Sequence, residues 1–319
     1  MVCAIGIDLG GSSAKVALIA RSGEVLDADS VDTTTATDAE MLLSSIAVVV
    51  DAMRARATKH TLSVIGVGCG VSGYLDPTGT RIVVNNTPAL DGCAIVPWLQ
   101  ARFDLPIAVD NDACVAALAE ARLGGLSDKK RILFVTVGSG IGVVLVADGT
   151  VVRVMHGVSG DASHLIVNHG STERCPVGCR GCLETMASAR GIAREGVRAA
   201  INGESDALAR TLRESGMVTG ISVSAAASAH DAAALRILRD AGHWLGVGLA
   251  SWACIYAPEH ILIGGAVATA GGAWLDTAVQ TMRDVGMPLL VDRLGVTRAT
   301  LGNQAGVVGA GLLALDRLA

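Results

Sequence analysis

Two parts of the chain show the same order of apolar and polar positions. In each, a short apolar run (residues 3–7 and 132–137) enters a glycine turn, and a second apolar run (residues 16–20 and 143–147) leaves it. A further small turn and a third extended stretch follow in both places. Short apolar runs bounded by glycine predict β-strands. The pattern therefore predicts two copies of one β-hairpin unit.

Longer segments between these units carry helix-forming residues with apolar positions on one side. They predict helices over residues 39–57, 95–102, 113–123, most of 185–257, about 273–285 and 306–318, and strands over 63–69, 106–109 and 261–263. Residues 72–92 are rich in Gly, Pro, Asn and Thr, which indicates a long connection. The alternation of strands with helices predicts an α/β fold with a mixed sheet in each half.

The duplicated hairpin favours two lobes in a chain of 319 residues. We expect residues 1–120 to form a smaller N-terminal lobe and residues 121–305 to form a larger second lobe. The last predicted helix, within residues 306–319, can complete the first lobe. A loop rich in Gly, His and Cys at residues 155–184 interrupts the second.

The composition is that of a large folded core. Apolar residues make up 51% of the chain and charged residues 17%, which excludes disorder over most of its length. The net charge is −5 and no basic cluster is present, which argues against a nucleic-acid-binding surface.

The sequence shows no membrane or export signal. Residues 244–257 are strongly apolar, but the run is too short to span a bilayer and is typical of a buried helix. Asp8 interrupts the first apolar stretch, so no signal peptide is predicted. Eight cysteines without such a signal indicate reduced thiols. We expect a cytoplasmic protein with neither a membrane nor a nucleic-acid partner.

Both glycine turns are typical of phosphate-binding loops. Glycine lacks Cβ, so its backbone can take positive φ and its N–H groups can approach an anion closely. The candidate phosphate-binding residues are Gly10, Gly11 and Ser12 in the first turn and Gly138, Ser139 and Gly140 in the second.

Two charged residues flank the first turn. Asp8 ends the first predicted strand, where a carboxylate suits Mg²⁺, usually through water. The alternative is an aspartate that only caps the turn. Lys15 either approaches the phosphates or is an ordinary solvated lysine.

Asp112 is the candidate general base. Phosphoryl transfer to a hydroxyl needs a carboxylate near the attacking oxygen, with positioning and charge neutralisation supplying most of the remaining catalysis. The alternative is an acid favoured at the start of the helix that follows, as an N-cap or in the first turn. Asn111, the preceding residue, could hold a substrate hydroxyl.

One imidazole and three thiols lie within 19 residues: His164, Cys175, Cys179 and Cys182. This set matches the ligand count of a closed structural zinc site. Ordinary reduced thiols are the alternative. Glu184, two residues later, is either a first-turn helix acid or a carboxylate that binds a ligand.

Together these segments resemble the ROK group of sugar kinases and sugar-responsive repressors. The resemblance covers essentially the whole chain, through IDLGGSSAK at 7–15, VDNDA at 109–113, VGSGIG at 137–142, the block at 157–164, CPVGCRGCLE at 175–184 and APEHILIGGA at 257–266. It implies a two-lobed, duplicated actin-like and hexokinase-like (ribonuclease H-like) α/β fold with mixed sheets and an interlobe cleft. ATP and Mg²⁺ would bind through the two glycine turns, with Gly264 and Gly265 near the adenosine.

The resemblance also implies an activity. It is the ATP-dependent phosphorylation of a hexose 6-hydroxyl with Asp112 as base. The sugar hydroxyls would be held by Asn111, Asp161, His164 and Glu184. Members of the family are often homodimers.

The chain departs from the family pattern at several positions. Asp161 stands where Glu is usual, Ala89 replaces a sugar-contacting Asn, and Cys93 replaces a Trp. Val177 replaces the central cysteine, with Cys179 offered two places later. A lost amide and a shortened carboxylate change how a site discriminates sugar substituents. Glucose and an amino sugar, such as the kanosamine of antibiotic pathways, therefore both remain candidate acceptors.

A non-catalytic, sugar-sensing regulator is the alternative of a different class. Family repressors carry an N-terminal helix-turn-helix of several tens of residues. We expect none here, because the first phosphate motif begins at residue 8.

Overall fold

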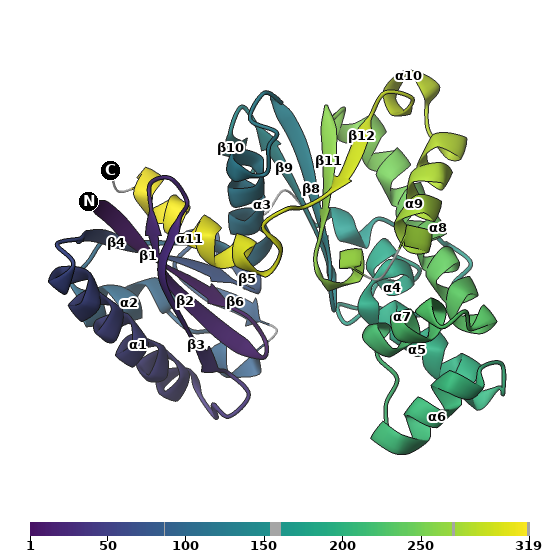
Figure 1. Cartoon of the computed structure of the whole chain (residues 1–319), viewed down its shortest axis with the longest axis horizontal. Coiled ribbons are helices and arrows are strands. Elements are labelled where there is room, and N and C mark those ends of the chain that lie inside the picture. The colour runs from purple at the N-terminus through teal and green to yellow at the C-terminus, as the bar shows by residue number, and fades with distance from the viewer. Residues whose placement is uncertain (86, 154–160, 270–271, 318–319) are drawn as a thin grey trace. The chain divides into compact units, whose positions relative to one another are not determined.

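The computed structural model describes residues 1–85, 87–153, 161–269 and 272–317 (Figure 1). The chain divides into two compact units. Unit 1 comprises Met1–Lys130, Val144–Gly160 and Thr300–Ala319, and unit 2 comprises Arg131–Val143 and Asp161–Ala299.

A five-stranded mixed sheet forms the centre of unit 1. Its strands are β1 (Val2–Leu9), β2 (Ser13–Ala20), β3 (Val25–Asp32), β4 (Ser63–Val71) and β7 (Ile107–Asn111), in the order β3-β2-β1-β4-β7. The first three strands pair antiparallel, and β4 and β7 run parallel to β1. The first predicted hairpin unit is confirmed.

Four α-helices accompany this sheet in the described residues: α1 (Ala39–Lys59), α2 (Ile95–Phe103), α3 (Asp112–Leu123) and α11 (Ala305–Arg317). Helix α1 begins at Asp38, whose side chain accepts a hydrogen bond from the backbone N–H of Met41 at 2.8 Å. Its apolar side is buried and contains Leu42, Leu43, Ile46, Val50 and Met53. Helical spacing of these residues is what the sequence pattern detected.

Helix α11 approaches the sheet closely because glycines lie beneath it. A Cβ added at Gly6 in β1 would overlap the carbonyl oxygen of Val307, and one added at Gly68 in β4 would overlap that of Ala310. Only a residue without a side chain leaves room for this contact. The last helix of the chain thereby packs against the strands of unit 1.

The segment over residues 72–92 is more ordered than its composition predicts. It contains β5 (Gly73–Leu75), β6 (Ile82–Asn85) and the short 3₁₀ helix η1 (Pro88–Leu90), with β5 and β6 paired antiparallel. Asp76 stabilises the turn between the strands by accepting hydrogen bonds from the Thr80 and Arg81 backbone N–H groups. Strands this short give no readable alternation, so the sequence indicated only a connection.

A second five-stranded sheet has the order β10-β9-β8-β11-β12. Its strands are β8 (Arg131–Val137), β9 (Ile141–Ala147), β10 (Thr150–Val151), β11 (His260–Gly264) and β12 (Gly295–Arg298). The division between the units falls inside β9. Strands β8, β11 and β12 are parallel, and β9 and β10 are antiparallel. The α/β class with a mixed sheet in each half is confirmed, although β12 was not predicted.

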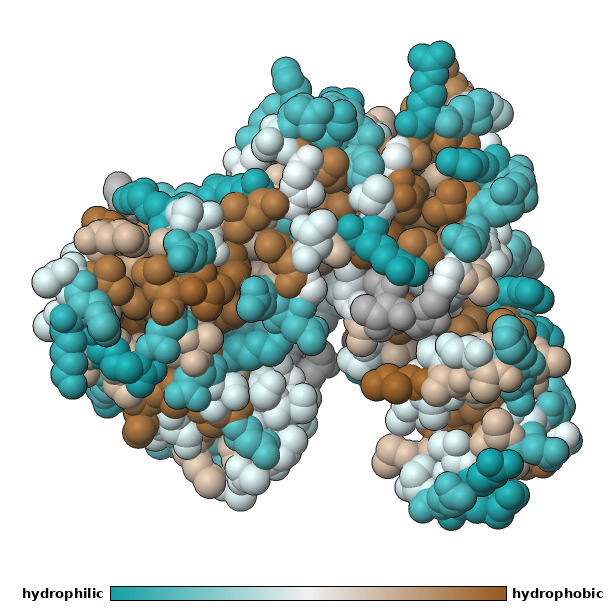
Figure 2. Space-filling model, viewed as in Figure 1, coloured by the Kyte–Doolittle hydropathy of each residue, from teal (hydrophilic) through white to brown (hydrophobic). Residues whose placement is uncertain are grey.

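Helices make up most of the rest of unit 2. They are α4 (Leu183–Ala187), α5 (Ala189–Ile201), α6 (Asp206–Ser215), α7 (Gly220–Ser228), α8 (Ala232–Tyr256), α9 (Gly272–Val285) and α10 (Pro288–Val291), with 3₁₀ helices η3 (Ala162–His164) and η4 (Ala266–Thr269). Figure 2 shows hydrophilic residues over α6, which buries only Leu208. The apolar run at residues 244–257 belongs to the 25-residue α8, which packs along α9. None of the helices over the described residues combines the length and the apolar character of a membrane span.

Candidate functional site

Three parallel strands of unit 1 bring candidate residues to one edge of its sheet. Asp8 in β1 is in register with Gly70 in β4, and Gly70 with Asp110 in β7. Asn111 ends β7, and Asp112 begins α3 directly after it. Because the carboxyl ends of parallel strands meet at the same edge, this edge holds Asp8, Asn111 and Asp112 together.

The environment of Asp112 prepares its carboxyl group for proton transfer. Burial raises its pKa, and the nearby Asp8 carboxylate raises it further, to about 7. The backbone N–H of Ala113 donates to Asp112 Oδ1 at 2.7 Å, which favours the charged form and opposes this rise. A carboxyl group with a pKa near 7 can take up a proton at neutral pH.

Asn111, not Asp112, caps α3. Its side-chain oxygen accepts hydrogen bonds from the backbone N–H groups of Ala113 at 2.9 Å and Cys114 at 3.4 Å. Its Nδ2 donates to the carbonyl oxygen of Gly73 at 2.9 Å. Asn111 therefore fixes the start of α3 and ties it to β5. Of the two forms of the alternative interpretation, the N-cap is therefore wrong and the first-turn acid is confirmed, because Asp112 lies in the first turn of α3.

Asp8 lies against the start of α11. A Cβ added at Gly306 would lie 2.6 Å from Asp8 Oδ2, so glycine leaves the room that this carboxylate occupies. Burial raises the pKa of Asp8, while the positive charge of Lys15 lowers it. The positive end of the helix dipole also favours a carboxylate here. The Asp8 carboxylate at this place suits a divalent cation.

Lys15 makes a solvent-exposed contact with the segment that leads into α11. Its Nζ donates to the backbone carbonyl oxygen of Asn303 at 2.8 Å, and its backbone is in register with Asp8. The contact joins β2 to the segment that leads into α11. The ammonium group is thus placed near the candidate magnesium ligand.

The glycine turns do not use positive φ. Among the candidate phosphate-binding glycines, only Gly265 has φ in the left-handed region, at 86°. That expectation was therefore wrong for Gly10, Gly11, Gly138 and Gly140. Gly11 and Gly138 have no atom within 4 Å of the place where a Cβ would stand. Absence of a side chain leaves open space beside the backbone, which still permits close approach of an anion.

The second glycine turn is tied to the segment that follows the cysteines. The carbonyl oxygen of Gly138 accepts from the backbone N–H of Ala189 at 2.8 Å, and Glu184 Oε2 accepts from the N–H of Ile141 at 3.1 Å. A Cβ added at Gly140 would lie 2.5 Å from that same carboxylate oxygen. Glu184 is in the first turn of α4, as one of its two interpretations held, and it also reaches the backbone of β9.

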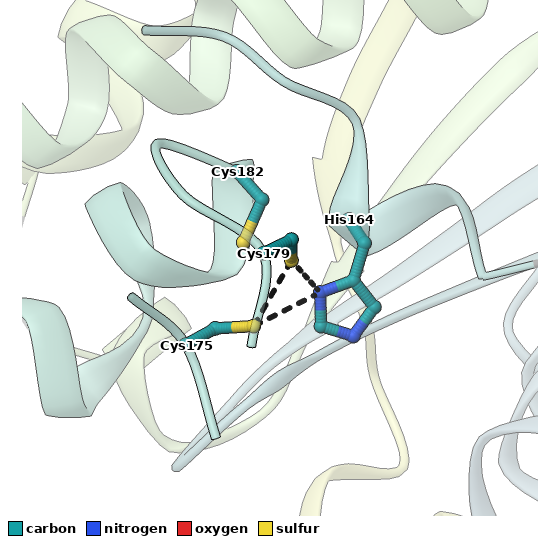
Figure 3. Close-up of side chains that lie close together, drawn as sticks. All are labelled: His164, Cys175, Cys179 and Cys182. Carbon is teal, nitrogen blue, oxygen red and sulfur yellow. Dashed lines mark hydrogen bonds between the residues drawn. The ribbon is translucent and has the colours of Figure 1, made fainter. Parts of the chain in front are cut away.

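His164 and the three cysteines come together in unit 2 (Figure 3). The Sγ atoms of Cys175 and Cys179 are 3.0 Å apart, and His164 Nδ1 lies 3.7 Å and 3.3 Å from them. One ligand atom from each of the four residues lies within 4.8 Å of the others. The Cys179 thiol joins this cluster although its place in the sequence is shifted by two residues from the family pattern. The donor set of one imidazole and three thiols fits structural zinc.

Hydrogen bonds within the cluster shift the pKa values of two of its groups. Burial alone would raise the pKa of Cys182, but hydrogen bonds from His164 and Thr185 lower it to about 6. Hydrogen bonds to Asp161 and Cys182 raise the pKa of His164 to about 11. A thiolate beside these groups is the form of cysteine that ligates metals.

The two ring nitrogens of His164 face different groups. Nδ1 faces the thiols, whereas Nε2 lies 3.3 Å from Asp161 Oδ2. The Asp161 carboxylate also accepts a hydrogen bond from the Ser163 hydroxyl. Residues 157–160, the first part of the family-like block that ends at His164, lie outside the described residues.

Unit 2 contains a pocket of about 620 Å³ beside the second glycine turn. Its walls come from the turn, α5, α7 and η4: Gly138, Ser139, Ala189, Arg190, Ala193, Val218, Thr219, Gly220, Ile221, Ser224, Ala225, Ser228, Ala266 and Val267. Gly264 ends β11, and Gly265, against β8, turns the chain toward the pocket-lining Ala266 and Val267. A cavity of this size suits a small molecule.

Sequence reasoning missed the walls of this pocket that belong to α5 and α7. These helices supply small and mildly polar residues such as Ala193, Thr219 and Ser224, which are common in any helical region. No motif marks them. Only folding brings them to the glycine turn.

Comparison with known proteins places the chain in a family. The family model described as "ROK family" matches residues 4–317. A glucokinase from Halalkalibacterium halodurans is 33% identical over 310 residues, covering 97% of this chain and 94% of that protein.

Solved structures agree. A ROK family glucokinase from Streptomyces griseus, in complex with glucose and AMPPNP, has a TM-score of 0.78 and 28% identity, covering 98% of this chain and 99% of that one. A ROK family transcriptional regulator, a homolog of the E. coli MLC protein, has a TM-score of 0.87 and 25% identity, covering 98% of this chain and 78% of that one. The expected actin-like, hexokinase-like fold class is confirmed. The chain belongs to the ROK family.

Proposed function

We propose that the chain is an ATP-dependent sugar kinase that transfers the terminal phosphoryl group of ATP to the 6-hydroxyl of a hexose. The observation that carries this proposal is the partly buried Asp112, whose pKa is about 7 beside Asp8. Kinases named in the comparisons support it, since a glucokinase is 33% identical to the chain.

Asp112 is the proposed general base. Its carboxylate accepts the proton of the sugar 6-hydroxyl as that oxygen attacks the terminal phosphorus of ATP. The bond between this phosphorus and the bridging oxygen breaks, and ADP leaves with the bridging oxygen. Asn111 holds the start of α3 in place, and its second amide hydrogen remains for a sugar hydroxyl.

Asp8 is the proposed magnesium ligand, directly or through water. Mg²⁺, when bound, supplies positive charge that offsets the charge on the transferring phosphoryl group. Lys15, placed beside Asp8 by β-sheet register, adds a second positive charge. We assign the exposed backbone of Gly11 and Ser12 to the phosphates, while the N–H of Gly10 donates to the carbonyl oxygen of Ser13 at 3.1 Å and holds the turn.

The nucleotide pocket of the proposal is the cavity in unit 2. Its 620 Å³ and mostly uncharged walls suit an adenosine, and the turn containing Gly138, Ser139 and Gly140 forms one end of it. Gly264 and Gly265 directly precede Ala266 and Val267, which line another part of the pocket wall. The S. griseus glucokinase was crystallised with AMPPNP, which favours a nucleotide site in this related chain.

The sugar hydroxyls are assigned to Asp161, His164 and Glu184, by resemblance to the family. We also propose that His164 binds zinc through Nδ1 together with Cys175, Cys179 and Cys182. The Nε2–H then faces Asp161, so the metal and the sugar-side carboxylate contact different ring nitrogens. Zinc, when bound, would fix the loop that leads to Glu184.

The identity of the sugar depends on a few replaced residues. Glucose is supported by the related glucokinases. Ala89 lacks the carboxamide usual in the family, and Asp161 is one methylene shorter than Glu, which favours testing amino sugars such as kanosamine. We propose glucose or a glucose-like amino sugar as acceptor.

An ATP-consumption assay over a panel of hexoses and aminohexoses tests this function. A 6-phosphorylated product from one class of sugar supports the proposal and names the acceptor. Absence of ATP consumption with every sugar, together with sugar binding, would favour a sugar-sensing regulator instead. A gel shift with promoter DNA then tests this regulator function, which the similarity to a ROK family transcriptional regulator supports.

A further inference from the structure

Arg190 is the one charged residue in the wall of the unit 2 pocket. The other lining residues are glycine, alanine, valine, isoleucine, serine and threonine. Arg190 lies in the first turn of α5, and its side chain is exposed. Its position beside Gly138 and Ser139 places a permanent positive charge near the glycine turn.

Among the described residues, Arg190 has no ion-pair or hydrogen-bond partner for its guanidinium group. Two later arginines of the same helix do. Arg194 lies 3.1 Å from Glu195 and 3.5 Å from Glu173, and Arg198 lies 3.0 Å from Glu195. The three arginines recur at four-residue spacing. Within the described residues, Arg194 and Arg198 are in ion pairs, whereas the guanidinium group of Arg190 is available to bind a ligand.

The local backbone adds to the positive potential at this end of the pocket. Helix α5 is 13 residues long and begins here, with Ser188 as its N-cap. The backbone N–H of Ala189 donates to the carbonyl oxygen of Gly138, which holds the helix start against the turn. The positive end of a helix dipole favours anions. Gly138 leaves open space at the same place.

We propose that Arg190 binds the phosphate chain of the nucleotide donor that occupies this pocket, an inference that rests on the proposed kinase function. The uncharged walls receive the nucleoside, and the guanidinium group pairs with phosphate oxygens. Arg190 therefore selects phosphorylated nucleotides over the free nucleoside. It is a binding residue rather than an acid or base of the reaction.

Calorimetric titration with adenosine, AMP, ADP and ATP tests the proposal on the whole chain. The variants are Arg190→Ala and Arg190→Lys, with Arg198→Ala as a matched control that removes the same charge from the same helix away from the pocket. Arg190→Ala should weaken ATP binding about tenfold or more, as for a lost hydrogen bond to a charged group. Adenosine binding should change by less than about twofold, and Arg190→Lys should recover part of the loss.

Kinetics provide a second measurement. Arg190→Ala should raise KM for ATP and leave KM for the sugar unchanged, while Arg198→Ala should leave both unchanged. Thermal unfolding of each variant checks that the fold is intact, and Arg190→Gln serves if the alanine variant does not fold.

Three results would overturn the proposal. Equal loss of adenosine and ATP binding would mean that Arg190 only shapes the pocket. Unchanged ATP binding in a folded Arg190 variant would remove its role while leaving the kinase function standing. A folded wild-type protein that binds none of the four ligands would overturn the proposed function as well.

Discussion

The side-chain carboxylate of Glu184 accepts a hydrogen bond from the backbone N–H of Ile141, at 3.1 Å. This contact joins the residue that follows the cysteine cluster to the glycine turn between β8 and β9. One hydrogen bond thus connects the proposed sugar ligand to the strand that follows the proposed phosphate turn. A substitution that displaces either partner should therefore shift the position of the other.

Gly140→Ala should impair sugar binding. The added methyl group would lie 2.5 Å from Glu184 Oε2 and would push the carboxylate away from Ile141. We expect KM for the sugar to rise about tenfold, equivalent to loss of about one good hydrogen bond to a charged group. Steady-state kinetics with varied sugar measure this.

The matched control for that variant is Gly170→Ala, in the same unit. A Cβ there would lie 3.6 Å from its nearest neighbour, an ordinary contact. A Gly140→Ala enzyme with the same sugar KM as wild type would show that Glu184 does not contact the sugar.

Asp112→Asn should abolish turnover. An amide cannot accept the hydroxyl proton, and general-base catalysis contributes about 10²- to 10⁴-fold to rate. Asn111 still caps α3 in this variant, so the local backbone and sugar binding should persist. Turnover is measured by ADP release, and sugar affinity by calorimetry. Near-normal turnover would show that another group takes the proton.

The activity should depend on the protonation of Asp112. Its carboxyl pKa is raised to about 7, chiefly by burial, and only the deprotonated form can act as base. The value of kcat/KM should therefore fall about tenfold per pH unit below about 7 and level off above it. A pH profile of kcat/KM for MgATP, which reports the protein before Mg²⁺ and ATP bind, measures this. A midpoint at about 4, the ordinary aspartate pKa, would argue against Asp112 as base.

The same raised pKa affects stability in the opposite direction. Folding disfavours the charged form of Asp112. The Asp112 side chain therefore contributes most to the free energy of unfolding at low pH, where it is protonated. That contribution is lost as the pH rises from about 4, where the unfolded chain titrates, to about 7. Asp112→Asn should therefore raise the melting temperature at pH 8 relative to wild type, as measured by thermal unfolding. A lower melting temperature at pH 8 would contradict the burial of this charge.

The cysteine cluster should hold zinc. Protein purified without added metal is expected to contain about one zinc ion per chain, because four suitable ligand atoms already lie within 4.8 Å of one another. Cys179→Ser should lower this content. Cys254→Ser, which changes an exposed cysteine outside the cluster, should keep it. Elemental analysis of each purified protein measures the zinc content per chain. Wild-type protein without zinc would refute the proposed zinc site.

Short-range patterns were enough for most secondary structure. The buried apolar positions of α1 recur at helical spacing, and β1 is a short apolar run that ends at a turn. Burial imposes these periods directly, so they can be read from neighbouring residues. The strands β5, β6 and β12 were missed because three or four residues carry no distinct period.

The candidate chemistry was visible where it is local in sequence. Cys175, Cys179 and Cys182 are close neighbours along the chain, and Asp112 follows a short strand. Their surroundings were not visible. The pKa of Asp112 is raised first by burial and then by Asp8, more than a hundred residues earlier in the chain. Electrostatic interaction depends on distance in space, which sequence separation does not report.

By itself, the sequence determined the duplicated strand and turn pattern, the α/β class and the residue types available for phosphate, metal and proton transfer. Tertiary structure decided which residues meet: Glu184 with Ile141, His164 with the thiols, and Arg190 with the glycine turn. The physical reason is that local periodicity follows from burial along one element. Pockets, shared hydrogen bonds and shifted pKa values arise only when elements remote in sequence pack together.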